Sequence, residues 1–326
     1  PLSYNSNNFN IWISPVRSIR SPEGIWSADQ INGLHLYPSG IGYKAFPIVG
    51  PYNNNFYAMD WQSNTLAVAS GRLLGKLPSF SSNGIHVLRD EAWDFKNIQS
   101  VQQWQDENIW DFIDISVNPN DPLEYAVASY SEKPLTIFST DTVEVFDDTN
   151  SSLSFTGIEN GWSLASDVCF DTQDNLWVLN GYTEQPLNVR LEDESWMNFD
   201  CGSSARNIYT TKMIIDFNDH IWFASEDHGM FGYNHNNTID EPNDDASVHI
   251  STGINSGNLP SSNVTALAAD FDGEIWVGTD AGFAILYNAG SSFEANAGEY
   301  DVQRVKVTFE GNVEYVLGNT HITDSE

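Results

Sequence analysis

Positive charge is scarce in this sequence. Only 13 residues are Lys or Arg, against 45 Asp and Glu, which gives a formal net charge of −32 at pH 7. A surface this acidic opposes non-specific binding to nucleic acids and to anionic membranes, both of which attract basic proteins. The simplest explanation for the excess of acids is a solvated, self-repelling surface that resists aggregation.

Cysteine and long hydrophobic runs are also rare. We interpret the two cysteines, Cys169 and Cys201, as small buried hydrophobes more readily than as a disulfide, and so few thiols are compatible with an exported protein. No apolar run approaches the ~18 residues of a membrane span. No signal peptide opens the chain, but it begins at Pro1 without a start methionine, so that absence carries little weight. We expect the chain to be a piece of a longer protein.

Catalytic and cofactor-binding motifs are absent from the sequence. It contains no H-E-x-x-H, G-x-S-x-G, Walker or dinucleotide fingerprint. The seven histidines are scattered, and His220 and His228 have no third partner at ligand spacing. Paired carboxylates, as used in glycoside cleavage, are uninformative here because 45 acids guarantee chance pairs. The sequence therefore predicts no enzyme activity, no catalytic residue and no cofactor-binding residue.

A recurring pattern of turn and strand is what the sequence does contain. In DFDGEIWVGTDAGF, residues 270–283, Asp270 to Gly273 suit a tight turn, Ile275 to Val277 are β-forming, and a second turn ends at Gly282. An Asp stands six residues before a Trp in three copies: Asp171 and Trp177, Asp216 and Trp222, Asp270 and Trp276. A fourth copy keeps Gly24, Trp26 and Gly33 without the leading Asp. Such self-similarity indicates a repeat architecture.

Two weaker copies complete the series. They place Ala67 and Ala126 where the Trp would be, so the marker positions are 26, 67, 126, 177, 222 and 276, separated by 41 to 59 residues. Four-stranded propeller blades take ~40 to 50 residues plus their loops. A β-forming segment precedes each turn, as at 112–117, 166–170, 212–216 and 263–270, and no long segment has the 3.6-residue period of a helix. The sequence therefore predicts an all-β propeller of four-stranded antiparallel blades.

The blade count depends on the end of the sequence. THITDSE, residues 320–326, aligns with SNVTALA, placing His321 on Asn263. This alignment predicts a seven-bladed propeller whose seventh blade begins near residue 321 and is incomplete in this chain. The alternative is six blades with a disordered tail. Residues 7–13 are a candidate closing strand. On either reading, we expect residues 1–326 to form a single propeller domain.

The repeat residues are expected to be structural. One indole per blade at fixed phase is what packing between sheets requires, and turn geometry accounts for the aspartates. We therefore interpret these residues as repeat markers: Trp26, Trp177, Trp222, Trp276, Asp171, Asp216, Asp270, Gly273 and Gly282. The one candidate calcium site is the acidic loop at 236–249, with Asp240, Glu241, Asp244 and Asp245, and its alternative explanation is a solvated surface loop.

The pattern carries a family resemblance. Residues 270–282 match, almost completely, the D-x-x-G-x-I-W-V-G-T-x-x-G pattern of two-component-regulator propeller repeats. An ordered series of segments resembles the PorZ family, cell-surface components of the type IX secretion system of Gram-negative bacteria. The segments are GIWSADQINGLHLY, GPYNNNFYAMDW, NLWVLNG, NNTIDEPNDD and the stretch 253–288. This resemblance runs from about residue 11 to 326 and is strongest from 216 to 288.

The resemblance implies a non-enzymatic role. The family has two seven-bladed propellers followed by a C-terminal β-sandwich, and this chain resembles the second propeller. The family belongs to an outer-membrane attachment complex with the sortase-like protease PorU and the β-barrel proteins PorV and PorQ. That complex joins cargo to anionic lipopolysaccharide, which the family is thought to bind and deliver. The expected location is the cell surface, in association with the outer membrane.

Charge raises an objection to glycan binding by this chain. A net charge of −32 repels an anionic polysaccharide unless cations cluster locally or divalent ions bridge the two. The basic residues to locate are Arg17, Arg20, Arg72, Lys76, Lys212, Arg304 and Lys306. If they are scattered, we expect glycan binding in another domain and protein docking here.

Two further hypotheses for the function are a sensor propeller of a hybrid histidine kinase and a polysaccharide lyase or hydrolase. The latter requires His, Tyr and acidic residues at the channel mouth.

Overall fold

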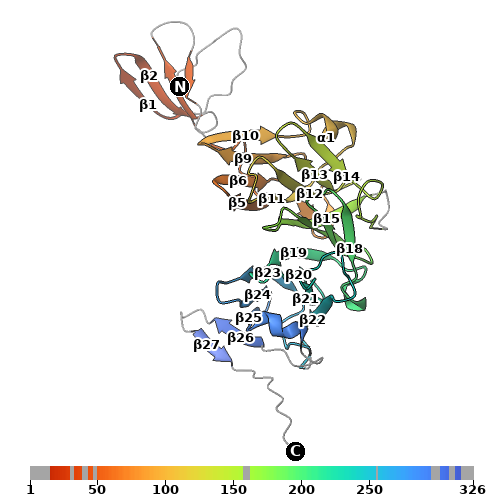
Figure 1. The fold of residues 1–326 in the computed structure, drawn as a ribbon. Coiled ribbons are helices and arrows are strands. Elements are labelled where there is room, and N and C mark those ends of the chain that lie inside the picture. The colour runs from red at the N-terminus through yellow and green to blue at the C-terminus, as the bar shows by residue number, and fades with distance from the viewer. Residues whose placement is uncertain are drawn as a thin grey trace, which may run out of the picture. The chain divides into compact units, whose positions relative to one another are not determined.

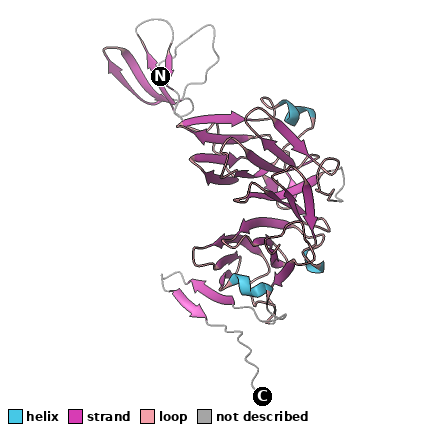
Figure 2. Ribbon diagram, viewed as in Figure 1, coloured by secondary structure: helices cyan, strands magenta, loops and turns pink. Residues whose placement is uncertain are grey.

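The computed structural model describes residues 15–29, 33–38, 43–46, 50–156, 162–254, 256–294, 302–307 and 313–316. They belong to two compact units, Pro1–Pro51 and Tyr52–Glu326. Strands dominate both units, and every strand pair in the described ranges is antiparallel (Figures 1 and 2). The predicted all-β, antiparallel architecture is confirmed.

Helices are few and short. The described ranges contain α1 (Gln102–Asp106) and two 3₁₀ turns, η1 (Ser203–Ala205) and η2 (Ala289–Phe293). None of them has the length and apolar character needed to cross a bilayer.

The first unit is one four-stranded sheet in sequential order. Its strands are β1 (Pro15–Ser21), β2 (Gly24–Asp29), β3 (Gly33–Tyr37) and β4 (Lys44–Phe46). The marker Trp26 lies in β2, opposite Ile19 of β1 and Leu36 of β3.

The second unit contains five further meanders of four sequential strands. They are β5 (Ala58–Gln62), β6 (Thr65–Ala69), β9 (Ile85–Arg89) and β10 (Ala92–Lys96); β11 (Phe112–Val117), β12 (Tyr125–Ser131), β13 (Leu135–Phe138) and β14 (Val143–Phe146); β15 (Ser163–Phe170), β16 (Leu176–Gly181), β17 (Leu187–Arg190) and β18 (Trp196–Phe199); β19 (Thr210–Ile215), β20 (Ile221–Ser225), β21 (Gly229–Asn234) and β22 (Ala246–Ile250); and β23 (Val264–Ala269), β24 (Ile275–Thr279), β25 (Gly282–Leu286) and β26 (Val302–Val307). A small hairpin, β7 (Leu73–Leu74) and β8 (Leu77–Pro78), interrupts the first of them.

The repeat phase read from the sequence matches the strand order. All six marker positions lie on the second strand of a meander: β2, β6, β12, β16, β20 and β24. Two details depart from simple repetition. Tyr130 and Ser131 of β12 pair with Leu164 and Ser163 of β15, which joins two meanders into one sheet. β27 (Val313–Val316) adds a fifth strand beside β26.

The blade count stays a prediction. Residues 7–13 and 321–326, assigned from the sequence to a closing strand and a seventh blade, lie outside the described residues. The expectation of a single domain over 1–326 likewise stays a prediction.

The cores lie between successive meanders. One buried cluster combines β6 and β9 with β11 and β12, the next combines β12 and β13 with β15 and β16, and two more continue to β25. The first strands β5, β11, β15, β19 and β23 contact one another in that order, and we call them the first-strand row. Within the second unit, successive sheets thus bury their faces against one another, as repeated blades do.

Candidate functional site

The three Asp and Trp pairs of the repeat form one recurring arrangement, which we call the Asp–Trp corner. The Oδ2 atom of the Asp accepts the indole N–H at 3.0 Å (Asp171 and Trp177), 2.9 Å (Asp216 and Trp222) and 2.8 Å (Asp270 and Trp276). The Oδ1 atom accepts the backbone N–H groups two and four residues later. One carboxylate thus closes the turn and holds the next strand's indole, which explains the constant spacing.

The turn itself needs a left-handed residue at its fourth position. Asp174 (φ 65°), Asp219 (φ 62°) and Gly273 (φ 82°) occupy it in the three corners. Glycine enters this region freely and Asp tolerates it, which explains the alternation of the two residue types there. Gly282 has a φ of 126° where β25 begins.

The Asp216 corner includes a histidine side chain. Its Oδ2 atom also contacts Nδ1 of His220 at 2.9 Å. Burial acts to raise the pKa of Asp216, but the hydrogen bonds from His220 and Trp222 outweigh it and hold that pKa below its ordinary value. His220, one of the two histidines considered as ligands, is therefore part of a structural network.

The three indoles differ in burial. Trp177 and Trp222 are 1% and 0% exposed, and they pack against His235 (5.7 Å between ring centroids) and Phe293 (5.3 Å). Trp276 makes the same hydrogen bond but is 41% exposed. The sequence reading of the marker tryptophans as core residues therefore fits the first two but not the third. The hydrogen bond joins two residues of the same corner, whereas the rings that bury Trp177 and Trp222 come from segments far along the chain.

A charged cluster spans the first-strand row. Lys212 of β19 places its Nζ 3.0 Å from Asp167 of β15 and 3.2 Å from Asp114 of β11. Burial, with the charge of Asp114, raises the pKa of Asp167, and the two carboxylates raise the pKa of Lys212 against its own burial. Asp114 also accepts the Val168 N–H at 3.0 Å, and Asp60 of β5 accepts the Val117 N–H at 2.8 Å. These carboxylates therefore bond one meander's first strand to the next.

The β7–β8 hairpin is rigidly anchored at its base. The buried carboxylate of Asp111 accepts four hydrogen bonds at 2.8 Å, from the N–H groups of Ser79, Phe80 and Ser81 and from the Ser79 hydroxyl. A Cβ at Gly71 would lie 2.1 Å from the carbonyl oxygen of Phe112, so only glycine fits there. Leu74, Leu77 and Phe80 remain 54%, 61% and 51% exposed.

The hairpin reaches a distant meander. Lys76 at its tip pairs with Asp227 and, at 3.3 Å, with Glu226, both in the turn between β20 and β21. Its Nζ also lies 5.2 Å from the ring centroid of Tyr209, which contacts Tyr182 at 5.5 Å between centroids. Apolar and aromatic side chains thus gather where the hairpin crosses to the β19–β22 meander.

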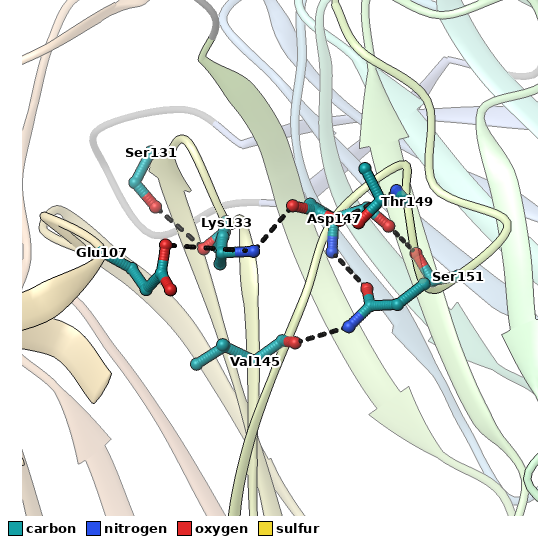
Figure 3. Close-up of polar contacts among 8 residues, drawn as sticks. Glu107, Ser131, Lys133, Val145, Asp147, Thr149 and Ser151 are labelled. Carbon is teal, nitrogen blue, oxygen red and sulfur yellow. Dashed lines mark hydrogen bonds and ion pairs between the residues drawn. The ribbon is translucent and has the colours of Figure 1, made fainter. Parts of the chain in front are cut away.

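A second polar cluster fixes the loop after β14. Lys133, in the turn between β12 and β13, lies 2.8 Å from Asp147 and 3.9 Å from Glu107 (Figure 3). Asp147 also accepts the backbone N–H and hydroxyl of Thr149. Burial acts to raise the pKa of Asp147, but the bonds from Lys133 and Thr149 hold it below its ordinary value. This cluster ties three loops together.

The calcium site predicted in the acidic loop stays a prediction, and two of its carboxylates bond neighbouring side chains. Its candidates were Asp240, Glu241, Asp244 and Asp245. Asp244 accepts the Thr238 hydroxyl at 2.9 Å, and Asp245 bonds the Tyr233 hydroxyl. Across the described ranges, no three His, Cys, Asp or Glu side chains are arranged to hold a metal ion.

The cysteines are free. Cys201 is buried and Cys169 half-buried, and burial raises the pKa of both thiols. The interpretation as small hydrophobes therefore fits the structure better than a disulfide.

The basic residues chosen from the sequence do not gather into one patch in the second unit. Lys76 and Lys212 are each paired with two carboxylates, and Arg72 is exposed. Arg17 and Arg20 lie in β1 of the first unit, and Arg304 and Lys306 lie in β26, where only the backbone is described. The sequence did not reveal Asp111 or the hairpin, although the 59 residues between the markers at 67 and 126 indicated extra structure there.

Comparison with known proteins agrees with this architecture. Residues 258–281 match the family model named two component regulator propeller, and they include the Asp270 corner. No curated protein matches the sequence.

Two solved structures share the fold. One is PorZ of Porphyromonas gingivalis, described as an essential bacterial surface component of the type-IX secretion system. It has a TM-score of 0.69 and 22% identity, over 90% of this chain and 41% of PorZ. The other is the extracellular domain of BT4673 from B. thetaiotaomicron, named as a hybrid two component system. It has a TM-score of 0.50 and 14% identity, over 93% of this chain and 34% of that one. The chain spans less than half of either protein, and it is similar in fold to PorZ.

Proposed function

We propose that this chain is a non-enzymatic scaffold propeller of a type IX secretion system, exported to the cell surface and associated with the outer membrane. The observation that carries the proposal is the shared fold with PorZ over 90% of the chain. Because the identity is 22%, the fold alone is shared, and the role is inferred. The proposed partners are the sortase-like protease PorU and the β-barrel proteins PorV and PorQ.

The anchored hairpin supports a docking role. Leu74, Leu77 and Phe80 are more than half exposed although Asp111 fixes the hairpin's base. A preorganised apolar element lowers the entropy lost on binding a protein partner. We therefore propose that the hairpin contributes to the contact with the attachment complex.

Charge argues against direct capture of an anionic glycan by the second unit. Lys76 and Lys212 are already paired with carboxylates, so neither supplies a free cation for lipopolysaccharide. We propose that lipopolysaccharide delivery depends on another part of the full protein. Titration of this chain with lipopolysaccharide, with and without calcium, tests this point. Saturable binding without calcium would contradict it.

Tyrosine chemistry supports the non-enzymatic assignment. Burial raises the pKa of Tyr130 to about 12, and it also raises those of Tyr57, Tyr182 and Tyr209. A lyase needs a tyrosine that ionises easily enough to act as a base, and the raised pKa values disfavour these four tyrosines for that role.

The deciding experiment is a pull-down of the full-length protein. A tag at the exposed β17–β18 turn, followed by cross-linking in the native cell and mass spectrometry, should recover PorU, PorV and PorQ. The same tag on an unrelated surface protein is the control. Recovery of none of the three would overturn the proposal.

A sensor role is the second candidate. The match at 258–281 and the fold shared with an extracellular domain of a hybrid two component system favour it. It predicts a membrane span and a kinase core in the same open reading frame, whereas the scaffold role predicts a β-sandwich. Sequencing that reading frame separates the two.

A further inference from the structure

The second unit contains a cleft that neither proposed role uses. The cleft has a volume of about 910 Å³ and lies between β9–β10 of one meander and β13–β14 of the next. This volume is within the ~300 to 1,000 Å³ typical of ligand sites. Tyr125 and Phe138, stacked at 4.8 Å between centroids, form part of its apolar wall.

The open edge of β10 borders the cleft. All five residues of β10, Ala92–Lys96, line it, although alternate side chains of a strand point to opposite faces. In contrast, β9 contributes Val87 and Arg89 but not Leu88, so the cleft covers one face of β9. The cleft therefore runs along the free edge of the sheet as well as over one face.

The backbone of this edge can accept another strand. The two-residue turn at Asp90 and Glu91, both with positive φ, makes Arg89 and Ala92 a hydrogen-bonded pair. Because such pairs alternate along an antiparallel ladder, the N–H and C=O groups of Trp93 and Phe95 face outward. Within the described ranges, β10 pairs with no strand other than β9.

Within the part of the chain that the structure describes, Arg89 supplies a cation without an ion-pair partner beside that edge. Its Nε donates to the Thr65 hydroxyl at 3.1 Å, and another guanidinium N–H donates to the Pro122 carbonyl. Lys96, the other cation of the cleft, is paired with Asp94 at 2.7 Å. Among the described residues, no carboxylate oxygen lies within 4.0 Å of Arg89, although acids outnumber basic residues 45 to 13 in the chain.

We propose that this cleft binds an extended segment of a partner protein that adds as a strand to β10 and places an acidic side chain on Arg89. Strand addition uses the free backbone groups of Trp93 and Phe95, and the apolar wall accepts flanking side chains. Strands are spaced ~4.8 Å apart, so the added strand lies ~10 Å from β9, a distance that an Arg and a Glu side chain span together. The half-buried guanidinium, held by two neutral acceptors, is preorganised for a carboxylate.

The test uses the whole chain and two peptides, acetyl-Ser-Val-Glu-Val-Ser-amide and its Gln counterpart. The Glu peptide should protect the amides of Trp93 and Phe95 from hydrogen exchange and bind about tenfold more tightly than the Gln peptide, which corresponds to one charge-assisted contact. Arg89→Gln should abolish that preference. Arg72→Gln, which removes an exposed cation of equal charge, should retain it.

A second variant guards against misfolding of Arg89→Gln. Ala92 is exposed and directly opposite Arg89, so Ala92→Glu neutralises the guanidinium without removing its contacts to Thr65 and Pro122. This variant should keep the unfolding midpoint and lose the Glu preference. Unprotected β10 amides at saturating peptide would overturn the proposal, as would equal affinity for the two peptides. Equal effects of Arg89→Gln and Arg72→Gln would also overturn it, because they would indicate general charge attraction.

Discussion

The Asp216 corner gives the sharpest test of how the repeat is stabilised. Each carboxylate oxygen of Asp216 accepts two hydrogen bonds. In Asp216→Asn, an amide NH₂ group replaces one of these oxygens, so two N–H donors would lose their acceptor and face an N–H group instead. Asp216 is 5% exposed, so water cannot take over these bonds. At ~1.5 to 3 kcal/mol for each bond to a charged acceptor, the loss is about 3 to 6 kcal/mol. At about 2 °C per kcal/mol, Tm should fall by roughly 6 to 12 °C.

The matched control is Asp270→Asn. Asp270 bonds its own turn and Trp276 in the same way, but Trp276 is 41% exposed and solvent reaches this corner. We expect a much smaller shift of the urea midpoint, monitored by Trp fluorescence. A double-mutant cycle of Asp216→Asn with Trp222→Phe should give a coupling of about 1 to 2 kcal/mol. Equal destabilisation by the two Asn variants would refute the reasoning, because burial would then not determine the cost.

The pH dependence of Asp216 has a definite sign. Its folded-state pKa is below the unfolded value of about 3.9. Its contribution is therefore complete above that unfolded value and is lost as the pH falls through the folded pKa. The wild-type protein should lose stability between about pH 4 and the folded pKa more steeply than Asp216→Asn.

Three further predictions concern the other polar clusters. Asp111→Ala leaves four hairpin donors unpaired, so amides of residues 79–81 should exchange faster while those of the β19–β22 meander do not, and unchanged exchange would contradict the anchoring role. Lys212→Met leaves Asp114 and Asp167 unpaired and should cost ~1 to 3 kcal/mol at pH 7, less than the ~3 to 5 kcal/mol of a fully buried pair, because the Lys212 side chain is 40% exposed. This loss should shrink as the pH falls toward the raised pKa of Asp167, because a protonated carboxyl group needs no partner charge, and urea midpoints measured across that range check it. Lys133→Gln should raise the pKa of Asp147 toward its ordinary value, as measured by NMR titration. Lys96→Gln, which removes a lysine paired with Asp94 elsewhere on the surface, should leave the pKa of Asp147 unchanged.

The sequence predicted the turns and strands of the repeat well because residues close together along the chain determine them. Turn residues and β-forming residues recur at fixed spacing, and the six markers accordingly lie on second strands. The Asp–Trp bond was within reach of the same reasoning, because a constant separation of six residues on either side of a turn indicates a contact. Turn geometry alone accounts for the bonds to Oδ1 of these aspartates but leaves those to Oδ2 unexplained.

The remaining features depend on contacts between distant residues. Asp111 bonds residues some 30 positions earlier, and Lys76 pairs with Asp227, 151 positions later, so no window of sequence contains either contact. The exposure of Trp276 likewise depends on what packs over it and not on its corner. The role of Arg89 likewise depends on the absence of an ion-pair partner among the described residues, although Asp90 and Glu91 follow it directly in the sequence, so the sequence alone does not indicate it.

The reach of the β7–β8 hairpin affects how the protein folds. In an ideal repeat array, each unit touches only its immediate neighbours, so stability propagates stepwise along the chain. Lys76 breaks this rule by joining the meander that begins at β5 to the one that begins at β19, with two others between them. Closing so long a loop is slow and must await the assembly of the intervening sheets. The hairpin should therefore be among the last elements to reach its native contacts in refolding, where it adds a direct contact between two meanders that are not sequence neighbours.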